Sequence, residues 1–74
     1  MREIVITTEF IKLQDLLKFS NLVETGGEAK ERIQAGEAQV NGELCLQRGK
    51  KIRPGDKVFF AGEYLTVIYA DRTS

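Results

Sequence analysis

The chain has 74 residues, with eleven basic and eleven acidic side chains, no histidine, no tryptophan and one cysteine. This length fits one domain, and a domain of this size buries only about 60% of the surface that its unfolded chain exposes. Hydrophobic residues make up 42% and charged residues 30%, which is too apolar for a disordered tail. The net charge of zero argues at first against a nucleic-acid-binding protein, because such proteins are usually basic.

The sequence supplies little for enzyme chemistry. Without histidine there is no imidazole base, and Cys45 has no second cysteine with which to share a metal ion or form a disulfide. We therefore expect no enzymatic activity, no cofactor and no metal, and a Cys45 that fills space in the core. No apolar run has the length of a signal peptide (about 7–15 residues) or a membrane span (about 20), so we expect a cytoplasmic protein without a membrane partner. Since no catalytic groups are evident, we also expect no small-molecule substrate.

The first twenty residues predict a strand followed by a short helix. Residues 4–6 are β-branched and predict an extended strand. Apolar residues at positions 10, 13, 16 and 17 are spaced as on one face of a helix, which we expect to end near Phe19. Ser20 and Asn21 then predict a loop.

A second helix is indicated by signals at both of its ends. Thr25 and Glu28 form a capping box, in which each side chain caps a backbone amide of the first turn. Gly36 occupies the position where a residue with left-handed backbone ends a helix. We therefore expect this helix at about residues 26–35.

The next segment predicts a tight β-hairpin. Asn41-Gly42 stands between two strand-like runs, and both residues tolerate the positive φ that a two-residue turn requires. Such a turn pairs Val40 with Glu43 and Ala38 with Cys45. Because successive residues of a strand alternate between its two faces, Cys45 shares a face with Ala38 and Val40 and is expected at the core.

Two more strands follow a turn at residues 53–56, whose composition is Arg-Pro-Gly-Asp. They are expected at residues 58–60 and 64–69, joined through residues 61–63. A strand, two helices and an antiparallel meander predict an α+β fold, in a single domain over residues 1–74.

The last strand is expected to be exposed and able to pair, which leaves the oligomeric state open. We expect core or edge packing, with no stacking platform, for the aromatic residues Phe59, Phe60, Tyr64 and Tyr69.

The charge is distributed unevenly along the chain. Residues 1–47 carry five basic and eight acidic side chains (−3), residues 48–57 carry five and one (+4), and residues 58–74 carry one and two (−1). We call residues 48–57 the basic segment. It suits a phosphate-binding surface, because local charge density sets the field that an RNA backbone meets. It suits equally well a solvated loop whose charges keep a sheet edge from pairing.

Thr25, Gly26 and Gly27 offer a second place for a phosphate. Two glycines in a first helical turn leave its free amides accessible, and the helix dipole favours an anion there. The simpler alternative is that the glycines only permit a tight turn between the two helices.

Taken together, these motifs resemble the S4 RNA-binding domain family, in which two short helices dock on a hairpin (the alpha-L arrangement). The resemblance covers about residues 10–60. It is carried by Lys12-Leu13, Leu16-Leu17, Thr25, Ala29-Lys30, Ile33, Gly36, Val40-Asn41-Gly42 and the run from Arg53 to Val58. The resemblance implies a non-catalytic protein that binds structured RNA, either rRNA or tRNA-like, in association with the ribosome.

The sequence departs from the usual family pattern at three places. Thr25-Gly26 stands where the family usually has Ser-Arg, Gln14 replaces an acidic residue, and Ala38 replaces a valine. The stretches at residues 25–30 and 48–51 are more similar to the small stand-alone bacterial branch of the family, the YaaA/YbcJ type.

Together with the possible phosphate site at residues 25–27, the expected RNA-binding residues are Lys12, Thr25, Gly26, Gly27, Lys30, Arg48, Lys50, Lys51 and Arg53. The resemblance supports Lys18 and Arg32 less strongly.

The main alternative is a ubiquitin-like β-grasp module that binds proteins and not RNA. Its size is similar, and residues 55–60 would suit its late strand. A sulfur carrier with that fold needs a C-terminal Gly-Gly for adenylation. This sequence ends Asp71-Arg72-Thr73-Ser74, so we expect no carrier chemistry.

Overall fold

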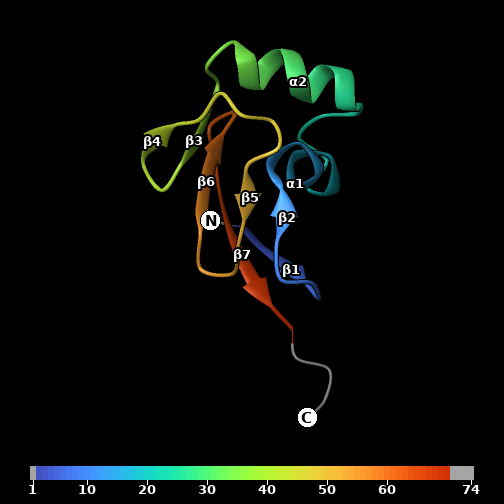
Figure 1. Ribbon diagram of the computed structural model, residues 1–74, viewed down its shortest axis with the longest axis vertical. Helices are drawn as coiled ribbons and strands as arrows, with labels where there is room; N and C mark the ends of the chain where they lie inside the picture. The colour runs from blue at the N-terminus through green and yellow to red at the C-terminus, as the bar shows by residue number, and fades with distance from the viewer. Residues whose placement is uncertain (1, 71–74) are drawn as a thin grey trace.

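The computed structural model describes residues 2–70 (Figure 1). Residue 1 and residues 71–74, on which the argument against a carrier depends, lie outside the described residues. The elements are β1 (Arg2–Ile6), β2 (Ile11–Lys12), α1 (Leu13–Phe19), α2 (Gly26–Gln34), β3 (Ala38–Val40), β4 (Glu43–Leu44), β5 (Lys51–Ile52), β6 (Lys57–Phe60) and β7 (Glu63–Tyr69). The expected α+β class is confirmed.

The strands form one five-stranded sheet and one two-stranded sheet. The larger has the order β1-β7-β6-β3-β4, and the smaller pairs β2 with β5. The antiparallel meander is confirmed in β3, β6 and β7, while β1 pairs in parallel with β7, which the sequence did not indicate. The expectation that the last strand is exposed for pairing is wrong, because β7 lies between β1 and β6 and has no free edge.

The first helix begins later than its apolar spacing predicts. It starts at Leu13 and not at Phe10, because Ile11 and Lys12 pair with Ile52 and Lys51 as a short antiparallel ladder. This ladder supplies backbone hydrogen bonds from a segment about forty residues away, which helical periodicity cannot anticipate. The predicted end at Phe19 is confirmed.

The second helix has the predicted signals at both ends. The Thr25 hydroxyl accepts a hydrogen bond from the Glu28 amide at 3.0 Å, whereas the Glu28 carboxylate caps the amide of Glu24 and not that of Thr25. At the other end Gly36 has φ of 86° and its amide donates to Ile33, which ends the helix in a left-handed turn.

Both β-hairpins turn through two residues. Asn41 and Gly42 have φ of 52° and 84°, and Val40 faces Glu43 as predicted. Ala61 and Gly62 likewise have positive φ, so β7 begins at Glu63, one residue earlier than expected.

The helices and the inner face of the larger sheet share one hydrophobic core. Alternate residues within three of its strands are buried, as alternation predicts: Ile4 and Ile6 in β1, Val58 and Phe60 in β6, and Leu65 and Val67 in β7. The buried apolar residues are Ile4, Ile6, Leu13, Leu16, Leu17, Val23, Ala29, Ile33, Ala38, Val40, Ile52, Val58, Phe60, Leu65 and Val67. No helix within residues 2–70 is long and apolar enough to cross a membrane.

Candidate nucleic-acid interface

The start of α1 holds the basic segment by its backbone. The amides of Leu13 and Gln14 donate hydrogen bonds to the carbonyls of Lys50 and Arg48, at 2.9 and 3.0 Å. These two amides belong to the first helical turn, which has no intrahelical acceptor for them. Because backbone atoms make these contacts, the lysine and arginine side chains stay exposed to solvent.

Ile52 fixes the middle of the basic segment. Its side chain is fully buried, whereas Lys51 and Arg53 on either side of it are exposed. This is the alternation of a strand that has one face on the core. The core therefore sets the direction in which the neighbouring cations project.

Like charges face one another across the short β2–β5 ladder. Lys12 pairs directly with Lys51, which is unfavourable for two cations in the absence of a counterion. The ring of Phe10 lies close by, with its centroid 4.9 Å from the Lys51 ammonium and 5.8 Å from the Arg53 guanidinium. Cation–π contacts of this kind hold charged groups near a surface while leaving them able to bind an anion.

A hydrogen-bonded clamp joins the two turns beside this cluster. One carboxylate oxygen of Asp56 accepts from the Asn41 side chain at 3.1 Å, and the other accepts from the Arg53 amide at 2.8 Å. The Asn41 carbonyl oxygen in turn accepts from the Lys57 amide at 2.9 Å. The sequence analysis treated both motifs only as turns and missed this contact, because fifteen residues separate the two side chains.

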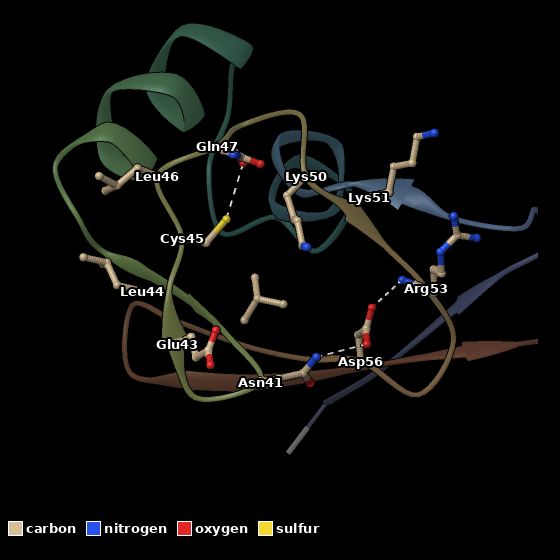
Figure 2. Close-up of a pocket in the computed structure, with 11 residues that line it drawn as sticks. Asn41, Glu43, Leu44, Cys45, Leu46, Gln47, Lys50, Lys51, Arg53 and Asp56 are labelled. Atoms are coloured by element: carbon tan, nitrogen blue, oxygen red, sulfur yellow. Dashed lines mark hydrogen bonds between the residues drawn. The ribbon is translucent and has the colours of Figure 1, made fainter.

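An open groove of about 600 Å³ separates the β3–β4 hairpin from the basic segment (Figure 2). Its basic wall carries Lys50, Lys51 and Arg53, and the Lys50 side chain reaches over the groove. The opposite wall carries Glu43, Leu44, Cys45, Leu46 and Gln47. The groove therefore offers cations beside Asp56 on one side, and on the other a mixed surface in which Leu44, Cys45 and Leu46 stand with Glu43 and Gln47.

Cys45 lies at the edge of the core. It is half-buried, packs against the core, and donates a long hydrogen bond from its thiol to the Gln47 carbonyl at 3.6 Å. Cys45 thus packs against the core as expected, but it is not fully buried and also lines the groove. Within residues 2–70, no three cysteine or carboxylate side chains stand close enough to hold a metal ion.

The start of α2, where the sequence predicts a phosphate site, has charged side chains of both signs nearby. A Cβ atom on Gly26 would lie 3.9 Å from the Lys18 ammonium, so a cation stands at the positive end of this helix. Lys18 is also 3.5 Å from Asp15. The Glu28 carboxylate caps the adjacent Glu24 amide, as described above. A phosphate bound at the amides of Gly26 and Gly27 would lie near both the Lys18 ammonium and the Glu28 carboxylate.

The other two basic residues of α2 differ in their surroundings. Lys30 is exposed and remains a candidate. Arg32 forms ion pairs with Glu28 and Glu37, and its guanidinium lies 4.5 Å from the ring centroid of Phe60. These contacts give Arg32 a role in packing α2 on the sheet.

The predicted residues thus fall into two groups at opposite ends of α1. Lys12 and the basic segment meet at its start, and the opening of α2 lies against Lys18 near its end. Seven helical residues span only about 10 Å, so both groups are within reach of one RNA.

The expectation of core or edge packing for the aromatic residues holds for Phe60, which is fully buried, and fails for two tyrosines. Tyr64 and Tyr69 keep 55% and 54% of their surface exposed. The two-residue turn of the β6–β7 hairpin places Tyr64 directly opposite Phe59, with ring centroids 4.6 Å apart. The pair was not expected, because a connection of three residues at 61–63 does not place Tyr64 opposite Phe59.

Two short helices that pack on a mixed sheet, with a basic segment tied to the first helix, define a small α+β domain of the alpha-L type. The S4 domain family matches residues 4–68, and the chain belongs to this family. The predicted family and fold are therefore confirmed, and the fold is not that of the β-grasp alternative.

Small bacterial proteins resemble the chain over most of its length. The probable ribosome maturation protein RlbA of Bacillus subtilis is 39% identical, over 80% of this chain and 83% of its own. The putative RNA-binding protein YbcJ of Escherichia coli is 36% identical, over 78% of this chain and 83% of its own. The solution structure of YbcJ, described as revealing an ALFAL motif involved in RNA-binding, covers 92% of this chain and 87% of its own, with a TM-score of 0.71 and 32% identity. The predicted likeness to the YbcJ type is confirmed.

Proposed function

We propose that this protein is a non-catalytic RNA-binding protein that holds structured RNA, either rRNA or a tRNA-like fold, through the phosphate backbone. The observation that carries this proposal is the direct opposition of Lys12 and Lys51 beside Arg53, fixed by the ladder and by backbone contacts to α1. An RNA phosphate would relieve the repulsion between these cations. The names given to YbcJ and RlbA support the same role, in association with the ribosome.

The contacts divide between the two ends of α1. The cations at the start of α1 would neutralise phosphates, and they are Lys12, Arg48, Lys50, Lys51 and Arg53. Near the other end, the amides of Gly26 and Gly27 would hold a further phosphate, with Thr25 and Lys30 nearby. Contacts of this kind position an RNA without reading its bases. Recognition would then depend mainly on the shape of the folded RNA.

The same proposal includes the setting in which the protein works. The chain acts as one domain over residues 1–74, without a cofactor, in the cytoplasm where ribosomes mature. The net charge of zero combines +4 in the basic segment with −4 in the rest of the chain. The surface outside the basic segment is therefore acidic and would repel RNA. Binding would therefore be confined to one face.

The dependence of affinity on salt tests this proposal. If about four to six phosphates are contacted, log K for a blunt RNA hairpin should fall with log[salt] at a slope of roughly −3 to −5. Fluorescence anisotropy of a labelled hairpin measures this slope, and the free energy of unfolding over the same salt range provides the control. An affinity that does not change with salt while the protein stays folded would refute phosphate-backbone binding.

A further inference from the structure

An exposed row of side chains crosses the outer face of the larger sheet. Backbone pairing aligns Leu44 with Gln39, Gln39 with Phe59, and Phe59 with Tyr64. Side chains that face each other across antiparallel strands lie on the same side of the sheet. The buried neighbours of these residues, Ala38 and Phe60 among them, point to the core, so this row lies on the side away from it.

The aromatic pair in this row borders a shallow depression of about 400 Å³. It is lined by Gln39, Asn41, Gly42, Gly55, Lys57, Phe59 and Tyr64. A volume of this size lies within the range of small-ligand sites, roughly 300–1,000 Å³. The depression therefore combines an exposed ring, a free amide side chain and a cation.

The depression and the groove beside the basic segment share one lining residue. Asn41 lines both of them, and Lys57 is the last residue of the basic segment. An RNA strand that leaves the cluster around Lys51 would meet the Asn41 turn next, and then Lys57 and Tyr64. The positive charge of Lys57, at the end of the basic segment, favours a nucleic acid as the occupant.

The size of the patch argues against a protein partner. A stable protein interface buries about 800 Å² on each side. That is about a sixth of the 4773 Å² surface of this protein, far more than the apolar side chains of the row, Leu44, Phe59 and Tyr64, provide. Polar Gln39 and charged Lys57 flank the rings, whereas the centre of a protein interface is depleted of charge.

We propose that Tyr64, supported by Phe59, is a stacking site for an unpaired nucleobase of the RNA held by the basic segment. Aromatic side chains on exposed strands stack RNA bases whatever their sequence, because every base has a π-face. The Gln39 amide would hydrogen-bond the base edge, and Lys57 would neutralise its phosphate. The inference rests on the proposed function and adds single-stranded RNA next to a folded element as the preferred substrate.

Intrinsic fluorescence tests the stacking directly. The chain has no tryptophan and two tyrosines, so Tyr69→Phe leaves Tyr64 as the only strong emitter, and Tyr64→Phe leaves Tyr69 as the matched control. The probe is an RNA hairpin with a single-stranded extension of about five nucleotides, compared with the blunt hairpin. We expect the extension to quench Tyr64 strongly and Tyr69 little. Equal changes in the two proteins would overturn the proposal.

Affinity for the same two RNAs separates this inference from the proposed function. The extension should raise affinity about fivefold or more, and Tyr64→Ala should remove this gain without changing the binding of the blunt hairpin. If the blunt hairpin binds but the extension adds nothing, the stacking site is refuted and phosphate binding stands. If neither RNA binds, both proposals fail. If Tyr64→Ala instead abolishes a dimer seen in sedimentation, the face is a contact between copies and the stacking site is refuted.

Discussion

Reversing the charges of Lys50 and Lys51 together, with Lys50→Glu and Lys51→Glu, is expected to abolish measurable binding of a blunt RNA hairpin. For each phosphate contact, log K changes by about 0.9 for a tenfold change in salt. Relative to 1 M salt, each contact therefore raises affinity roughly eightfold at about 0.1 M salt. Two lost contacts and the added repulsion therefore reduce affinity by roughly a hundredfold or more. Fluorescence anisotropy against the wild-type protein measures the loss.

The fold is expected to survive this change. A glutamate at position 51 would face Lys12 across the ladder and replace a like-charge pair with an attractive one. The contact of α1 with Lys50 uses its backbone carbonyl, which the substitution leaves in place. Arg2→Glu, on the edge strand β1 of the larger sheet and outside the basic segment, is the matched control for Lys51→Glu alone, and it should leave affinity nearly unchanged. Unaltered RNA affinity in the folded double variant would rule out the basic segment as the binding surface.

Truncation of Phe60 to alanine is expected to remove a large part of the domain's free energy of unfolding. Phe60 is the largest fully buried side chain, and its ring also supports the Arg32 guanidinium. Removing a buried phenylalanine costs about 3–5 kcal/mol. The whole domain, at about 0.05–0.15 kcal/mol per residue, has a free energy of unfolding of only about 4–11 kcal/mol. Urea denaturation followed by circular dichroism measures the difference.

Phe19 provides the matched control for this prediction. It carries the same side chain at the end of α1 but is 62% exposed. Phe19→Ala should change the free energy of unfolding by no more than about 0.5 kcal/mol. Equal losses at the two positions would show that Phe60 is not the centre of the core.

Most parts of the fold that local sequence signals determine were predicted correctly, and the two-residue turn at Ala61-Gly62 was the exception. The Thr25 cap, the Gly36 helix end and the Asn41-Gly42 turn each depend on residues within a few positions of one another. Contacts between distant segments were not predictable in this way. The parallel pairing of β1 with β7 and the β2–β5 ladder both arise from tertiary packing, and the ladder shortens α1.

The candidate site shows the same division. Its charge was visible because five cations fall within ten consecutive residues. Its geometry was not, since it depends on the Asn41–Asp56 clamp and on α1 amides that bind carbonyls of the basic segment. A correct two-residue turn at Ala61-Gly62 would have revealed the pairing of Phe59 with Tyr64 from the sequence.

The central claim is that RNA is held by the basic segment at the start of α1, and a map of amide chemical-shift changes tests it most directly. Titrating the isotope-labelled protein with a blunt RNA hairpin should shift most strongly the amides of Lys12 and residues 48–53, with smaller changes at Gly26 and Gly27. The β1 amides serve as the internal reference and should hardly move. Binding with the largest changes on β1, or with none in the basic segment, would contradict the account.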